Sequence, residues 1–149
     1  MQVPSSPALA DLIARAERAD PALDAVLAAI APSVGDNIAA LRTALVPLAR
    51  SQAALVQANT DIGLVADELR RFQKYALPGK PSLQIVQLRK QQAAVKQAAL
   101  IARQNYAQAT HAFLRDSGLT APARRAPTDF SSGWLVKVIA QVGAEPTTR

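Results

Sequence analysis

The chain has 149 residues, a formal net charge of +6 and an aromatic content of only 4%. It contains no cysteine, which excludes a disulfide framework, a thiolate zinc site and a cysteine nucleophile. Because the composition is rich in alanine, leucine, glutamine and arginine, which favour helix, we expect an all-α protein.

Two short amphipathic helices are predicted within residues 1–35. Ser6 can cap the first helix, with Pro7 at its first position, and Asp20 and Pro21 repeat this arrangement before the second. The first residues lack the basic and apolar regions of a signal peptide, and no apolar run approaches the roughly 20 residues needed to span a bilayer. We therefore expect cytoplasmic synthesis, with no secretion through a signal peptide.

A long helical hairpin is predicted for residues 36–117. Leucine or isoleucine recurs every seven residues from Leu41 to Leu69, and a second heptad row runs from Ile85 to Phe113. Between the two rows, residues 77–82 hold two prolines around a glycine and so form a turn. Matching periods on both sides of a short break are typical of an elongated, antiparallel, coiled-coil-like hairpin.

Several residues are expected to modify the two long helices. Asp36 can cap the start of the first one and Gly118 can end the second. Pro47 lacks a backbone N–H group, so we predict a kink or a helix restart there, and residues 59–63 form a second weak point. Polar residues such as Gln52 occupy seam positions, where coiled coils use them to fix register or oligomeric state.

The second long helix carries another apolar row, about a third of a turn from its seam. Its members are Val86, Ala93, Leu100, Ala107 and Leu114. One partner helix cannot cover both rows. The N-terminal helices, a neighbouring subunit or both must therefore cover the second row.

The hairpin also carries most of the positive charge, because no acidic residue occurs from Leu69 to Arg115. The candidate contacts with a polyanion or an acidic partner protein are Arg70, Arg71, Lys74, Lys80, Arg89, Lys90, Lys96 and Arg103. The simpler interpretation is a solvated surface that is partly neutralised inside the hairpin. In that case Asp67 should lie near Arg89 and Lys96.

Residues 118–149 are predicted to form a proline-containing linker and an apolar C-terminal docking tail. The pattern of residues 134–142 fits a helix or a strand. Trp134, Leu135, Val138 and Ile139 are the candidate contacts with other structural proteins, since aromatic and aliphatic anchors suit a partner groove. The alternative is that this segment folds back on its own hairpin.

The chain offers few residues for chemistry. His111 is the only histidine, and Asp116 lies on another face of the same predicted helix, so no carboxylate is placed to orient a histidine base. No group of residues has metal-ligand spacing, and the isolated glycines form no phosphate-binding loop. We therefore expect no enzyme activity, no metal and no cofactor.

The order of these elements, with short N-terminal helices, a long hairpin and a docking tail, resembles small helical assembly proteins of tailed bacteriophages. Ejection proteins and small terminase subunits are among them, and the similarity extends to helices rich in alanine and glutamine. It implies a virion component. We predict a non-enzymatic structural protein that forms a homo-oligomeric helical assembly. Two alternatives stay open: a DNA-binding or DNA-packaging component that uses the basic hairpin, and an amphipathic helix protein that coats a membrane surface.

Overall fold

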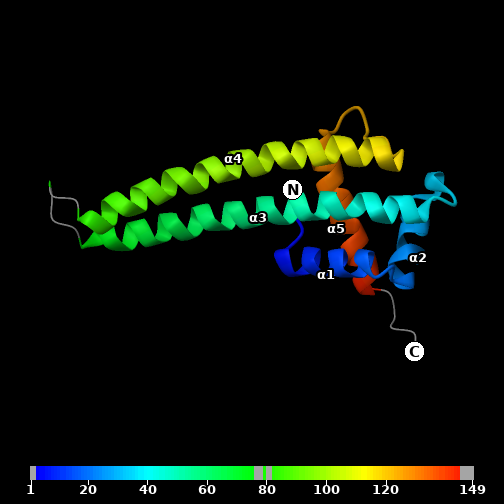
Figure 1. Ribbon diagram of the computed structural model, residues 1–149, viewed down its shortest axis with the longest axis horizontal. Helices are drawn as coiled ribbons and strands as arrows, with labels where there is room; N and C mark the ends of the chain where they lie inside the picture. The colour runs from blue at the N-terminus through cyan, green and yellow to red at the C-terminus, as the bar shows by residue number, and fades with distance from the viewer. Residues whose placement is uncertain (1–2, 76–78, 80–81, 145–149) are drawn as a thin grey trace. The chain divides into compact units, whose positions relative to one another are not determined.

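The computed structural model describes residues 3–75, 79 and 82–144. The described chain is all-helical, as the composition predicts. Its elements are α1 (Ser6–Glu17), α2 (Pro21–Ile30), the 3₁₀ turn η1 (Pro32–Val34), α3 (Ile38–Lys74), α4 (Leu83–Ser117) and α5 (Pro127–Ala144) (Figure 1). Residues 134–142, which the pattern leaves open between helix and strand, lie in α5. None of the described helices is long and apolar enough to cross a membrane.

Local capping explains most helix boundaries. The predicted cap of α1 is wrong by one residue, because Ser5 and not Ser6 accepts the hydrogen bond from the Ala8 N–H group (3.4 Å). Asp20 caps α2 as predicted, with its carboxylate 3.1 Å from the Ala22 nitrogen. The first long helix begins at Ile38, two residues after the expected cap Asp36.

Two further caps belong to the second long helix. The Ile85 N–H group donates to the Ser82 hydroxyl (3.2 Å) at its start. Gly118 follows its last residue with a positive φ of 75°, a conformation that favours glycine and is common just after a helix. The predicted turn at 77–82 lies outside the described residues except for Gly79 and Ser82.

The long helix α3 continues through Pro47 and through residues 59–63, so the expected helix restart is wrong. Pro47 leaves the carbonyl of Thr43 without its usual helical donor. Both residues are exposed, which lets water bond that carbonyl, while Leu45, Leu48 and Ala49 beside them are fully buried. Burial of these neighbouring side chains outweighs the missing hydrogen bond.

The chain divides into two compact units. The first, here called the bundle unit, comprises Met1–Ala53 and Asn105–Arg149, and the second, the hairpin unit, comprises Ala54–Gln104. The helices α3 and α4 contribute to both units. Each unit is described by itself below.

The bundle unit has a well-filled apolar core. Its fully buried side chains include Leu9, Leu23, Leu41, Leu48, Leu135 and Val138. Helix α5 packs against α1 and α2, and the Phe113 ring lies 5.0 Å from the Trp134 ring. Ion pairs join α3 to both N-terminal helices: Arg42 binds Asp24 of α2 (2.7 Å) and Arg50 binds Glu17 of α1.

A buried hydrogen-bond network lies between α3, α4 and α5 within the bundle unit. The Tyr106 hydroxyl is 2.6 Å from the Ser131 hydroxyl and 2.9 Å from that of Ser132. Ser132 donates to the side-chain oxygen of Gln52 (2.7 Å), and Thr110 shares a bond with Ser131 (3.0 Å). In the described chain no buried side-chain nitrogen or oxygen lacks a partner. This network fixes how α5 is rotated against the other two helices.

In the hairpin unit, α3 and α4 pack as an antiparallel pair, which confirms the predicted hairpin (Figure 1). One cluster of the seam joins Ala58 to Ala99 and Ala102. The other joins Leu69 to Ile85 and Leu88, with Phe72 against them. The seam is narrow and is built largely from alanine and aliphatic residues.

Candidate interaction surface

The predicted basic residues gather in the hairpin unit. Seven of the eight are described and all seven are exposed, whereas Lys80 lies outside the described residues. Four lie on α4: Arg89, Lys90, Lys96 and Arg103. The other three, Arg70, Arg71 and Lys74, lie near the end of α3. The hairpin unit contains eight basic and three acidic residues, so it holds +5 of the net charge of +6.

The expected placement of Asp67 near Arg89 and Lys96 is wrong. Asp67 pairs with Arg70 on its own helix, and its side chain is 61% exposed. The reason is rotational: Asp67 lies midway between the seam residues Val65 and Leu69, about 200° around the helix from each. Within the described chain, no carboxylate lies within 4.0 Å of the basic groups of Arg89 or Lys96.

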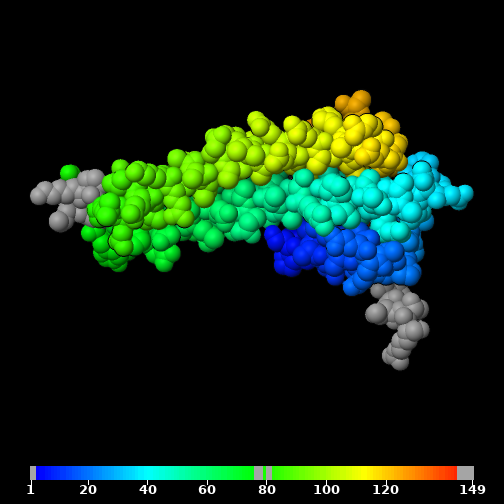
Figure 2. Space-filling model, in the orientation of Figure 1, coloured from blue at the N-terminus to red at the C-terminus, as the bar shows by residue number. Residues whose placement is uncertain are grey.

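An exposed, largely apolar strip runs along the outer face of α4, about half a turn from the seam. Its large members are Leu83 (73% exposed), Val86 (37%), Leu100 (52%) and Ile101 (49%). Between Val86 and Leu100 the strip continues through exposed smaller or polar residues, Ala93 and Gln97 among them. Figure 2 shows the surface of this part of α4 in green to yellow-green. The first three members of the predicted second apolar row are therefore exposed.

Basic residues border this strip. Arg89, Lys96 and Arg103 are spaced by seven residues and form a row about a quarter of a turn from the centre of the strip. Lys90 lies within the strip, and α4 contributes no acidic residue to the hairpin unit. The outer face of α4 is thus both apolar and basic. Sequence reasoning identified the row of Val86 and Leu100 but missed Leu83 and Ile101, which the spacing of three and four residues could have added.

The middle of α3 carries negative charge around an exposed leucine. Leu64 is 60% exposed. The three acidic residues of the hairpin unit lie around it in the helix: Asp61 is three positions before it, and Asp67 and Glu68 are three and four positions after it. Sequence reasoning missed this acidic patch around Leu64. The signal was present, because all carboxylates of residues 54–104 fall within eight consecutive positions.

The predicted docking residues of the C-terminal tail lie inside the bundle unit. Trp134, Leu135 and Val138 are buried in the described chain, and Ile139 is half-buried. The segment folds back on its own chain, where it packs on α1 and α2 as well as on side chains of the two long helices. In this conformation the three buried side chains present no surface to an external partner.

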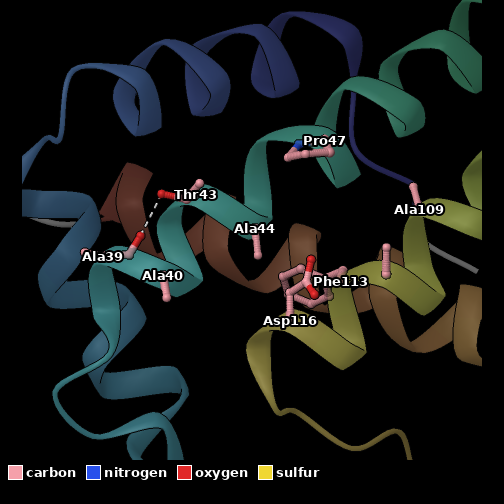
Figure 3. A pocket seen from close by; sticks show the side chains of 9 residues that line it. Ala39, Ala40, Thr43, Ala44, Pro47, Ala109, Phe113 and Asp116 are labelled. Carbon is pink, nitrogen blue, oxygen red and sulfur yellow. Dashed lines mark hydrogen bonds between the residues drawn. The ribbon is translucent and has the colours of Figure 1, made fainter.

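A shallow groove of about 480 Å³ lies between α3 and α4 in the bundle unit (Figure 3). Alanines line most of it, together with Thr43, Pro47, Phe113 and Asp116. Its single carboxylate, on Asp116, is 3.2 Å from the Arg115 guanidinium. The Thr43 hydroxyl donates to the Ala39 carbonyl (2.9 Å), as the dashed line in Figure 3 shows. Its polar side chains are thus engaged locally, and nothing in it combines an acid with a base.

Two further titratable side chains of the described chain are those of His111 and Tyr106. His111 is exposed. Burial raises the pKa of the Tyr106 phenol above its ordinary value, against the opposing effect of the serine and threonine hydroxyls bonded to it. No three metal-ligating side chains come together among residues 3–75, 79 and 82–144.

Comparison with known proteins gives no further information about the site. No protein-family model, no curated protein and no solved structure matches this chain.

Proposed function

We propose that the protein is a non-enzymatic structural protein that assembles with further copies of itself through the hairpin unit. The observation that carries this proposal is the apolar strip on the outer face of α4. Four large aliphatic side chains are exposed there on one helix face, and burying them against a neighbour removes apolar surface from water.

The strip is large enough to form the core of a contact. From Leu83 to Ile101 it runs about 27 Å along the helix, and a helix width of about 10 Å gives an area on the order of 300 Å². Stable interfaces bury roughly 800 Å² on each partner. The basic residues beside the strip must therefore also take part in the contact, or several copies must share it.

Light scattering coupled to size-exclusion chromatography tests this proposal on the full chain. We expect a mass of several chains that falls on dilution through the micromolar range. The variant Leu100→Gln with Ile101→Gln should weaken the assembly at least about tenfold, because it makes the strip polar.

Val3→Gln is the matched control, since it makes the same kind of change at an exposed apolar residue of the bundle unit. It should assemble like the unmodified protein. A monomer at every concentration would contradict the proposal. If that monomer also floats with anionic vesicles, the α4 face belongs to a lipid surface instead.

A second function is supported by a separate observation, namely the unneutralised basic row. Arg89, Lys96 and Arg103 have no ion-pair partner in the described chain, so phosphates could bind there with the release of counterions. Binding of duplex DNA should then weaken steeply with salt and should fall when Lys96 and Arg103 are changed to Glu. Changing Lys137 and Arg124, which are exposed in the bundle unit, to Glu is the control. Equal binding by both variants would exclude this second function.

A further inference from the structure

We propose that the end of the hairpin unit binds an anionic lipid surface, an activity beyond the self-assembly proposed above. This end lies where α3 stops at Lys74 and α4 starts at Leu83 (Figure 1). Two features meet there: a group of basic side chains, and exposed apolar side chains that lie still closer to the end. Surfaces that bind at a membrane interface combine these two features.

The charges nearest this end of the hairpin unit are all positive. No acidic residue follows Glu68 in the sequence until Asp116. Arg70 pairs with Asp67, one turn back on α3. Four other basic residues are exposed, and within the described chain none of them has a carboxylate within 4.0 Å. These four, here called the basic collar, are Arg71, Lys74, Arg89 and Lys90.

Helix dipoles explain only part of this charge. The C-terminal end of a helix favours bases, which suits Arg71 and Lys74 in the last turn of α3. The N-terminal end favours acids, yet the first turn of α4 contains none. The dipoles of the two helices therefore do not account for an end with bases alone. An external anionic surface has the complementary charge.

The exposed apolar side chains at this end are those of Tyr75 (81% exposed) and Leu83 (73%). The Tyr75 N–H group donates to the Phe72 carbonyl (3.3 Å), which holds Tyr75 on the last turn of α3. At the helical rise, Arg71 lies about 6 Å behind Tyr75, and Arg89 about 9 Å behind Leu83. The headgroup layer of a bilayer is about 5–8 Å thick on each side. When the two apolar side chains reach the hydrocarbon boundary, the basic collar therefore stands among the lipid phosphates.

These apolar side chains favour lipid over nucleic acid as the partner. Contacts with the phosphates of a nucleic acid need basic and polar groups, and they leave an aliphatic side chain such as Leu83 in water. Lipid buries that side chain at the acyl boundary. Tyrosine suits the level of the headgroups, because one end of its ring is apolar and the other is polar. The Lys74 ammonium lies 5.8 Å from the centre of the Tyr75 ring, so charge and ring reach the interface together.

Flotation with vesicles of phosphatidylcholine, with and without phosphatidylserine, tests the role of charge. The protein is used at a dilution at which light scattering shows single chains, in about 0.1 M salt, where the Debye length is about 10 Å. We expect flotation only with phosphatidylserine. Arg71→Gln with Lys74→Gln should bind at least about tenfold more weakly, because each basic residue near an anionic surface contributes about fivefold.

The matched control for charge is Lys96→Gln with Arg103→Gln. It changes the net charge equally, also at exposed positions of the hairpin unit. These two residues lie about 20 and 30 Å from Leu83 along α4, which is more than a Debye length. This control should float like the unmodified protein.

A second pair of variants tests the apolar side chains. Tyr75→Gln with Leu83→Gln should bind the vesicles at least about tenfold more weakly, because it removes the groups that enter the acyl boundary. Leu100→Gln with Ile101→Gln is its control and makes the same kind of change about 27 Å from Leu83. That control should float normally, although it weakens self-assembly. All four positions are exposed, so helical circular dichroism should be unchanged.

Three results would overturn this contact. In the first, the unmodified protein does not float with phosphatidylserine. In the second, only the Leu100→Gln, Ile101→Gln chain loses flotation, which places lipid along the later outer face of α4. In the third, the basic variant weakens flotation but the Tyr75→Gln, Leu83→Gln chain does not, which indicates a purely electrostatic site for phosphates. A chain that is monomeric at every concentration contradicts the proposed self-assembly but leaves these comparisons intact, since one hairpin unit forms the contact.

Discussion

The bundle unit and the hairpin unit use the same two helices for different purposes. The second apolar row of α4 passes through both units. Its later members, Ala107 and Leu114, are half-buried in the bundle unit, whereas Val86, Ala93 and Leu100 are exposed in the hairpin unit. An amphipathic row thus indicates that a helix face can be covered, but the surrounding elements decide whether its own chain covers it.

Polar residues show the same contrast. All five buried polar side chains of the described chain lie in the bundle unit, where hydroxyl and amide groups bond one another. Of the seven most exposed large apolar side chains, six lie in the hairpin unit. The bundle unit therefore uses its polar groups for internal specificity, and the hairpin unit leaves both apolar and charged groups at its surface.

The largest expected effect tests whether the bundle unit holds most of the stability. Phe113 is 2% exposed and its ring lies against Trp134. Phe113→Ala should lower the free energy of unfolding by about 3–5 kcal/mol, because it leaves a cavity in a packed core. Urea unfolding followed by the fluorescence of the single tryptophan measures this.

The contrasting substitution is Leu100→Ala in the hairpin unit. Leu100 is 52% exposed, so its loss should change the free energy of unfolding by no more than about 0.5 kcal/mol in a dilute monomer. If both variants lowered the free energy of unfolding by similar amounts, the two units would contribute equally to stability. The contrast drawn between them would then be wrong.

An intermediate effect is expected from the buried network. Gln52→Leu and Ser132→Ala should each cost about 1–3 kcal/mol, because each leaves a buried polar partner with fewer bonds. The double variant should cost less than the sum, with a coupling of about 1 kcal/mol, since the two side chains bond each other at 2.7 Å. Strict additivity in urea unfolding would mean that this bond adds nothing.

The smallest expected effect is the loss of stability at acid pH when the carboxyl group of Asp20 is protonated. The N–H group of Ala22, and then the guanidinium of Arg15, hold the pKa of the Asp20 carboxyl below its ordinary value. Its stabilisation is therefore complete above the ordinary pKa of about 3.9 and is lost as the pH falls through the lowered pKa. Asp20→Asn keeps the helix cap but removes the charge.

Thermal unfolding at a series of pH values measures this difference. The unmodified protein should melt at a higher temperature than Asp20→Asn near pH 6, and the two should converge as the pH falls through the lowered pKa of Asp20. A constant difference across this range would show that the charge of Asp20 does not stabilise the bundle unit.

Much of the fold could be predicted from the sequence because it depends on local and periodic signals. Pro21 after Asp20, the heptad rows and Gly118 each act through backbone geometry or helix period, which a single chain displays directly. The second apolar row is likewise visible as a spacing. These signals located the helices and the seam of the hairpin.

The remaining features depend on rotation and on distant segments. The charge pattern predicts that Asp67 faces α4, but helix rotation carries it outward, and only the seam reveals that rotation. The apolar tail containing Trp134 fits an external groove or an internal one equally well by its pattern. Burial against Phe113 and bonds from Ser132 to Gln52 decide between them, and both span long sequence separations.

The bundle unit is interrupted in sequence by the hairpin unit, and this order has a consequence during synthesis. A ribosome delivers Ala54–Gln104 complete before it makes the second part of the bundle unit, which begins at Asn105. Contacts close in sequence form fastest, so the hairpin unit can close on a nascent chain whose bundle unit still lacks α5. Neighbouring chains on one messenger would then have the opportunity to meet before either is finished.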